Sequence, residues 1–300
     1  MSSFLRSRHG VTGQRPYKWL AVTLLGWVAM TLGLFVATVV AHSLRTAGFP
    51  QNGTAAIQAL TSALIIVPAV YIIRRRFQLT MGLMPLTSGA ILHLLGGAAL
   101  GVIMAVLGFL ITGLLGWITI EEWHLSIDLI LSMSFNLCIA FLYEALPEEL
   151  SLRGIVYSGL RLRLPNYAAY MGQLLLFVLV PLTVNVLQSL VGIEKGNFIN
   201  WEYVILLVCF GTVLQQLRSL TGSLWASIGF HLSYLEIARF VILQRDNRLL
   251  TYSELDAGTG TVVIQFGIIV VGSSAILALL LLWRGSRPVN GTNGTGSLKI

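Results

Sequence analysis

Long apolar runs separated by short polar loops dominate the pattern of this chain. Crossing the hydrocarbon core of a bilayer takes about 20 predominantly apolar residues, and the chain holds about eight runs of roughly that length. The first run is too long for the core of a cleaved signal peptide, so we interpret it as a retained helix. The predicted membrane-spanning helices are residues 19–41, 55–73, 89–117, 127–146, 167–191, 203–217, 224–243 and 261–283.

The composition agrees with this pattern. Hydrophobic residues make up 56% of the chain and charged residues only 10%, with a mean hydropathy of +0.82. We therefore predict an all-α, polytopic membrane protein with a single transmembrane domain over residues 19–284. A basic N-terminus, residues 1–18, precedes it, and a flexible Gly/Ser/Asn-rich tail, residues 285–300, follows it. The two cysteines, Cys138 and Cys209, lie within predicted spans and are interpreted as apolar packing residues.

Basic residues mark alternate loops of this predicted topology. Cytoplasmic loops carry an excess of Lys and Arg, and here such residues precede the first span and follow the second, fourth, sixth and eighth. Both termini are therefore expected in the cytoplasm, with the protein in a bacterial plasma membrane. Anchoring to anionic lipid on the inner face explains the net charge of +7 without nucleic-acid binding. The basic residues concerned are Arg6, Arg8, Arg15, Lys18, Arg74, Arg75, Arg76, Arg161, Arg163, Arg218, Arg284, Arg287 and Lys299.

Three charged residues gather in the stretch PEELSLRG, residues 147–154, at the end of the fourth predicted span. Ionisable groups at membrane depth are costly, so such a cluster suggests a functional site. On a helix, Glu149 and Arg153 are four residues apart and share a face. We expect Arg153 to hold Glu149 ionised. The alternative is that the cluster is only the polar, interfacial end of a helix.

The other glutamate of the pair has a different predicted neighbour. Glu148 shares a helix face with Glu144 in an apolar setting, where we expect it to take up a proton and to act as a base or an acid. Pro147 cannot donate a backbone hydrogen bond and crowds the carbonyl of Tyr143, so the helix should bend just before the glutamates. Such a bend can open a cavity.

Two stretches of the chain resemble motifs of one protein family. PEELSLRG resembles the first motif, E-E-x-x-x-R, of the CPBP family of intramembrane proteases, the CAAX-processing and bacteriocin-processing enzymes also called Abi proteins. GSLWASIGFHLSY, residues 222–234, is similar to the family's third motif region, where a Gly-Ser-Leu-Trp-Ala start leads to a histidine. The resemblance covers about residues 125–245. It implies about eight transmembrane helices that enclose a cavity open to the cytoplasm.

The resemblance also implies a chemistry. In the family, the first glutamate and a histidine of an F-x-x-x-H motif activate a water for peptide cleavage, and a histidine and an asparagine spaced H-x-x-x-N stabilise the oxyanion. By position, Glu148 is the catalytic glutamate, Glu149 and Arg153 support it, and His231 lies on the oxyanion side. The implied substrates are membrane-associated or prenylated peptides. No cofactor is expected, because His231 and the glutamates do not form a convincing three-ligand zinc set.

Two positions depart from the family's pattern. The best match to F-x-x-x-H is FVLVP, residues 177–181, in which Pro181 replaces the histidine, and Leu235 replaces the asparagine four residues after His231. Asn185 is one turn beyond Pro181 and can supply only a polar contact. His93, in the third predicted span, is the remaining substitute base, although a hydrogen-bonded packing role is the favoured interpretation of it.

Two functions therefore remain open. One is an intramembrane endopeptidase that depends on Glu148 and His231. The other is a catalytically impaired scaffold with the protease fold, which binds a peptide or a partner protein without cleaving it, because losing one member of a catalytic set removes most of the rate. A transporter with a carboxylate proton relay is disfavoured, because no paired, broken helices are evident in two halves. The sequence does not specify the substrate or the oligomeric state.

Overall fold

The computed structural model describes residues 17–193, 200–255 and 260–286. The predicted N-terminal segment and tail fall almost wholly outside these residues. So do five of the basic residues that were used to predict the topology: Arg6, Arg8, Arg15, Arg287 and Lys299.

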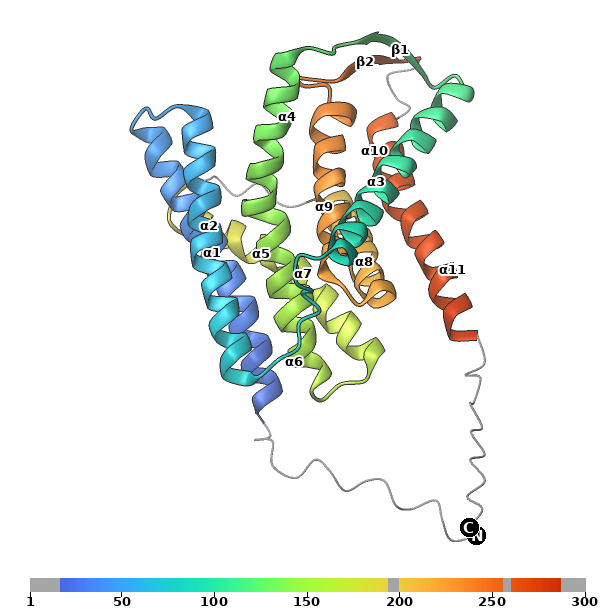
Figure 1. Cartoon of the computed structure of the whole chain (residues 1–300). Coiled ribbons are helices and arrows are strands. Elements are labelled where there is room, and N and C mark those ends of the chain that lie inside the picture. The colour runs from blue at the N-terminus through green and yellow to red at the C-terminus, as the bar shows by residue number, and fades with distance from the viewer. Residues whose placement is uncertain (1–16, 194–199, 256–259, 287–300) are drawn as a thin grey trace, which may run out of the picture.

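The described chain is a bundle of long helices joined by short loops (Figure 1). Among the described residues, seven helices are long and apolar enough to cross a membrane, which makes the protein an integral, multi-pass membrane protein. Five of them are regular: α1 (Lys18–Thr46), α2 (Gln51–Phe77), α3 (Ser88–Leu114), α7 (Asn166–Leu190) and α8 (Trp201–Thr221).

The other two candidate spans contain π-helical segments. The fourth runs for 35 residues, from Ile127 to Arg161, well past the boundary predicted at residue 146. It consists of α4 (Ile127–Ala140), a π-helix (Phe141–Ala145), α5 (Leu146–Glu148), a second π-helix (Glu149–Val156) and α6 (Tyr157–Arg161). The last span consists of α10 (Thr261–Gly267), a π-helix (Ile268–Gly272) and α11 (Ser273–Ser286).

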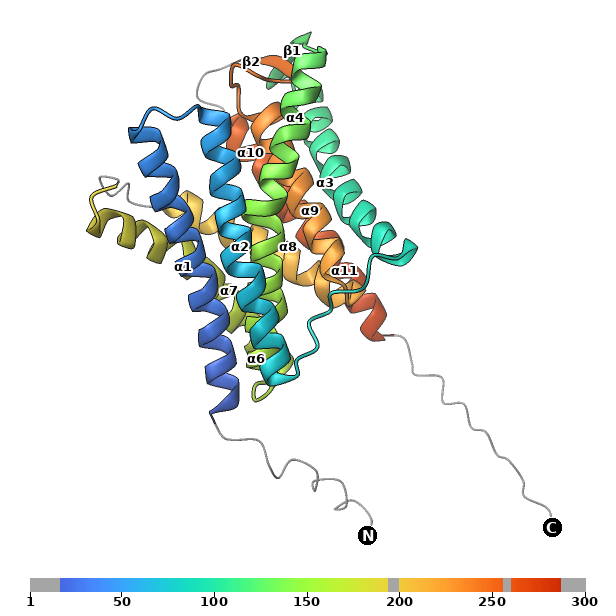
Figure 2. The ribbon, with the colours of Figure 1, turned by 60° about the vertical axis from the view of Figure 1, so that its left-hand side comes forward.

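The predicted span 224–243 is a central helix that is enclosed by its neighbours. It forms α9 (Leu224–Ile237) and a π-helix (Ala238–Ile242), and it is not among the seven candidate spans. Every residue from 224 to 231 is buried, and α9 lies against α3, α4 and α8 (Figure 2). A Cβ atom at Gly229 would lie 1.9 Å from the carbonyl oxygen of Leu94, so the backbones of α3 and α9 are in contact.

A small sheet closes one end of the bundle (Figure 1). β1 (Ile118–Trp123) pairs antiparallel with β2 (Leu250–Glu254), with Ile118 opposite Glu254 and Trp123 opposite Leu250. The sheet joins the connection between α3 and α4 to the connection between the central helix and α10. The sequence analysis did not predict these strands, because they are far apart in the chain and β1 falls in the short connection between the predicted spans 89–117 and 127–146.

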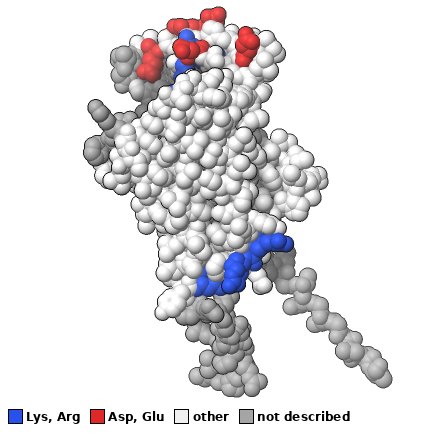
Figure 3. Space-filling view, turned by 90° about the vertical axis from the view of Figure 1, so that its left-hand side faces the viewer, with Lys and Arg blue, Asp and Glu red and all other residues white. Residues whose placement is uncertain are grey.

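The two ends of the molecule differ in the charge of their surface side chains. Acidic side chains gather at the sheet end, and a band of Lys and Arg lies at the other end (Figure 3). Glu121 and Glu122 of β1 belong to the acidic end, and the arginines in the last turn of α2 belong to the basic end. The first described span begins, and α11 ends, at the basic end (Figure 1). This arrangement agrees with the alternation of basic loops, while the side of the membrane that each end faces stays a prediction.

Candidate active site

The PEELSLRG stretch lies inside the long fourth helix, where the hydrogen-bond pattern changes twice. π-helical segments flank the short α5 that contains Pro147, and such segments are frequent at functional sites. Pro147 has no N–H group for the carbonyl of Tyr143. The hydroxyl of Ser62 in α2 donates to that carbonyl instead, at 3.3 Å. π-helical turns thus lie on both sides of Pro147, while the bend expected before the glutamates stays a prediction.

Glu149 and Arg153 form an ion pair in the protein interior. Both side chains are 0% exposed, and Arg153 Nη1 lies 3.2 Å from Glu149 Oε1. The guanidinium group also lies over the ring of Phe177, 4.3 Å from its centroid. This confirms the predicted pair. The alternative of a solvated, interfacial helix end does not fit these residues, because neither charge reaches solvent.

His231 reaches the same buried pair from α9. Its Nδ1 atom lies 3.6 Å from Oε1 of Glu149, and its ring contacts the Phe210 ring edge-on with centroids 4.9 Å apart. Glu149 thus faces Arg153 on its own helix and His231 on the central helix. Because Nδ1 faces Glu149, Nε2 is the ring nitrogen left for a substrate.

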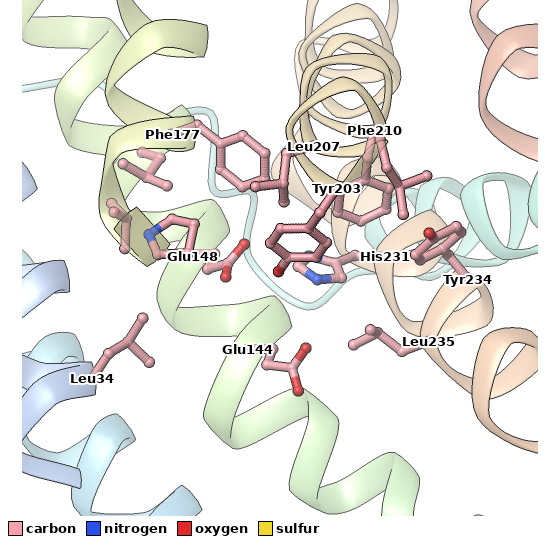
Figure 4. Close-up of a pocket in the computed structure, with 14 residues that line it drawn as sticks. Leu34, Glu144, Glu148, Phe177, Tyr203, Leu207, Phe210, His231, Tyr234 and Leu235 are labelled. Carbon is pink, nitrogen blue, oxygen red and sulfur yellow. The ribbon is translucent and has the colours of Figure 1, made fainter. Parts of the chain in front are cut away.

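Glu148 instead opens into a cavity of about 190 Å³ (Figure 4). Its side chain is 18% exposed, and Arg153 Nη1 lies 4.0 Å from its Oε2. Glu144 and His231 line the same cavity, whose walls are otherwise mainly aliphatic and aromatic. The sequence prediction that Glu144 and Glu148 share a helix face is therefore confirmed.

The charge of Glu144 is compensated by a chain of polar contacts. Glu144 Oε1 pairs with Nη2 of Arg239, whose Nη1 donates to Asn136 Oδ1 at 2.8 Å. The amide nitrogen of Asn136 donates to Glu236 Oε1. Arg239 has no such close contact with Glu148. Of the glutamates around the cavity, Glu148 is therefore the one that keeps a carboxylate available for a ligand.

Both departures from the family's motifs fall at this cavity. Pro181 and Leu235, which stand where the family has a histidine and an asparagine, both line it. The two substitutes that the sequence suggested do not: neither His93 nor Asn185 is among the lining residues. The Nδ1 atom of His93 is buried without a hydrogen-bond partner.

Two tyrosines at the cavity were missed by the sequence analysis. Tyr203, in the first turn of α8, lines the cavity together with Glu144 and Glu148 and points its ring toward Glu148 in Figure 4. Tyr234 lines the cavity from α9. Its position three residues after His231, on the same helix face, was a signal available in the sequence. Nothing in the sequence connects Tyr203 to PEELSLRG.

The side chains of the described residues do not form a set of metal ligands. Among the described residues, no group of three or more His, Cys, Asp or Glu side chains could hold a metal ion. Cys138 and Cys209 are free thiols that belong to different helices. Around Glu148, the nearby imidazole and guanidinium groups already face Glu149.

The central part of the chain matches a known protein family. Residues 130–234 match the family described as type II CAAX prenyl endopeptidase Rce1-like, a range that includes Glu148, Glu149, Arg153 and His231. No curated protein and no solved structure gives a match. The family implies an intramembrane protease that acts on a peptide or protein substrate. This central segment, which is less than half of the chain, is similar to the Rce1-like CAAX endopeptidases of the CPBP (Abi) family.

Proposed function

We propose that this protein is a CAAX-type intramembrane endopeptidase that cleaves membrane-associated or prenylated peptides with a water activated by Glu148. One observation carries the proposal. Of the two adjacent glutamates, Glu149 is fully buried and paired with Arg153 and His231, whereas Glu148 opens into the cavity. A general base must reach the water whose proton it takes, and Glu148 has the access that Glu149 lacks.

The reaction follows from these positions. Glu148 takes a proton from a water molecule, and the water oxygen attacks the carbonyl carbon of the scissile peptide bond. Glu148 then passes the proton to the leaving amine nitrogen as the C–N bond breaks. Negative charge develops on the former carbonyl oxygen and needs preorganised donors. His231, whose Nδ1 faces Glu149, can supply one such donor from Nε2 when that ring nitrogen carries a proton.

Tyr203 supplies a second donor in this proposal. The family's second oxyanion donor is an asparagine, and here Leu235 stands in its place. A tyrosine hydroxyl can donate one hydrogen bond, and that of Tyr203 belongs to the cavity that Glu148 lines. The apolar walls of the cavity suit a substrate with hydrophobic side chains or a prenyl group, and they exclude bulk water from the reacting groups.

The sidedness of the protein is part of the same proposal. We place the basic end of the bundle in the cytoplasm, because cytoplasmic segments carry the excess of Lys and Arg. The cavity would then receive substrates that approach from the cytoplasmic leaflet.

A non-cleaving scaffold is the second candidate, and a specific observation favours it. Pro181 and Leu235 bring apolar atoms to the cavity at the two positions where the family has polar catalytic groups. A cavity altered in this way could still hold a peptide, but it lacks the imidazole that helps to activate the water in the family and the amide that stabilises the oxyanion.

Glu148→Gln separates the two functions, because glutamine keeps the shape of the side chain and cannot take the proton. For an endopeptidase, cleavage of a prenylated peptide by the protein in proteoliposomes should fall by about two or more orders of magnitude, with substrate binding retained. Glu202→Gln, the same change at an exposed glutamate, is the matched control. Wild-type protein that binds the peptide without cleaving it would identify a scaffold, and normal cleavage by Glu148→Gln would refute the role of Glu148.

A further inference from the structure

The basic end of the bundle holds a second cavity, which is separate from the one at Glu148. Its volume is about 310 Å³, and it lies among the last turns of α6 and α8 and the segment that follows α2. Two arginines, Arg161 and Arg218, line it together with several side chains that carry hydroxyl or amide groups. None of the lining residues is acidic. The cavity is therefore polar, cationic and without a carboxylate of its own.

Arg218 is held in a fixed position with no counter-charge. Its guanidinium group lies over the Tyr157 ring, 4.5 Å from the centroid, and its Nε atom is buried without a hydrogen-bond partner. Among the described residues, Arg218 forms no ion pair. Removing an unpaired charge from water is unfavourable. An anion in this cavity would supply the missing counter-charge.

Arg161 is also oriented before any ligand arrives. Its Nη1 atom donates to the carbonyl of Leu164 at 2.6 Å, which leaves its other guanidinium nitrogens for a ligand. The hydroxyl of Ser158 donates to the carbonyl of Thr80 at 3.0 Å and so ties α6 to the segment after α2. The walls of the cavity are thus preformed by contacts within the protein.

A cavity lined by two arginines and by no acidic residue has the chemistry that recognises a phosphate group. Guanidinium groups match phosphate oxygens in planar, paired hydrogen bonds, and such charge-assisted bonds are among the strongest in proteins. A phosphate bound in this cavity could accept hydrogen bonds from the guanidinium groups that line it and would supply the counter-charge that Arg218 lacks. The hydroxyls of Tyr157 and Thr80, which also line the cavity, can donate to further oxygens.

We propose that this cavity binds the phosphate group of an anionic lipid headgroup. It lies at the basic end of the bundle, where the helices end, and basic pockets between transmembrane helices on the cytoplasmic side bind such headgroups in other membrane proteins. A free phosphate ion offers the same oxygens, so the test below separates the two sources. The site does not depend on whether the protein cleaves peptides.

The test uses the full chain in detergent micelles that contain equal amounts of phosphatidylglycerol and phosphatidylcholine. Native mass spectrometry counts the bound lipids. Wild-type protein should retain one phosphatidylglycerol in preference to phosphatidylcholine, and Arg161→Ala and Arg218→Ala should each reduce that retention by about tenfold or more. Arg163→Ala is the matched control, because Arg163 belongs to the same basic segment and is exposed but does not line the cavity.

A second arm titrates inorganic phosphate in a neutral detergent and follows its binding by calorimetry. Binding of phosphate that is lost in Arg161→Ala, without preference for phosphatidylglycerol, would identify a free phosphate ion as the ligand and overturn the lipid assignment. Equal retention of phosphatidylglycerol by the wild-type protein and by both variants would overturn the site itself. Arg161 is exposed, so its alanine variant should fold even where Arg218→Ala does not.

Discussion

Nδ1 of His231 lies 3.6 Å from an oxygen of Glu149, the second glutamate of the PEELSLRG stretch. With Arg153, these residues form one buried unit that joins the central helix to the long fourth helix. Glu148 precedes Glu149 in the chain, but its side chain is 18% exposed and opens into the cavity. Two adjacent carboxylates thus have different surroundings, and we expect changes to them to have different effects.

Arg153→Ala should destabilise the fold strongly. The change leaves the carboxylate of Glu149 buried without its closest counter-charge and also removes the contact with the Phe177 ring. Loss of one partner of a buried ion pair costs roughly 3–5 kcal/mol. Thermal unfolding of the purified protein in detergent measures the effect, with the exposed Arg163→Ala as control. Equal melting temperatures for Arg153→Ala and the wild type would show that the pair contributes nothing to stability.

Gly229→Ala should weaken the contact between α3 and α9. An added Cβ atom would lie 1.9 Å from the carbonyl oxygen of Leu94, so the two backbones must move apart. Overpacking of this kind costs roughly 1–3 kcal/mol, and His231, two residues further along α9, would shift with the helix. Gly113→Ala is the control, because its Cβ atom would meet no atom within 4 Å. Equal melting temperatures for the Gly229→Ala and Gly113→Ala variants would contradict the close approach of the α3 and α9 backbones.

The membrane-spanning segments were predictable because a bilayer requires long apolar runs, whatever those runs contact. The Glu149–Arg153 pair was predictable because residues four apart on a helix are neighbours. The length of the fourth helix was not predictable. A group of charged residues after an apolar run looks the same in the sequence whether the charges face the membrane surface or pair inside the protein. Tyr203 was missed for a related reason: its place beside Glu148 depends on how α8 packs.

The sidedness of the protein can be tested by cysteine labelling. In a variant that lacks Cys138 and Cys209, a cysteine at exposed Glu121 in β1 should react with a membrane-impermeant maleimide in intact cells. A cysteine at exposed Arg163, at the basic end, should react only after the cells are opened. These outcomes follow from the excess of Lys and Arg in cytoplasmic segments. Labelling of Arg163→Cys in intact cells would show that the basic end faces outward, opposite to the proposed orientation.

Tyr203→Phe tests whether a residue outside the family's motifs assists the proposed cleavage. Phenylalanine keeps the ring and removes the hydroxyl, so the cavity should keep its shape and its affinity for the peptide. Because an oxyanion donor acts mainly in the transition state, kcat should fall by about 10- to 100-fold with little change in KM. Tyr167→Phe, at an exposed tyrosine, is the control, and Tyr234→Phe asks whether the second cavity tyrosine shares the role. If kcat is unchanged in Tyr203→Phe but falls in Tyr234→Phe, the donor comes from the helix of His231. If neither change lowers kcat, while Glu148→Gln still abolishes cleavage, the oxyanion is stabilised without either tyrosine, and His231 must then serve as the main donor.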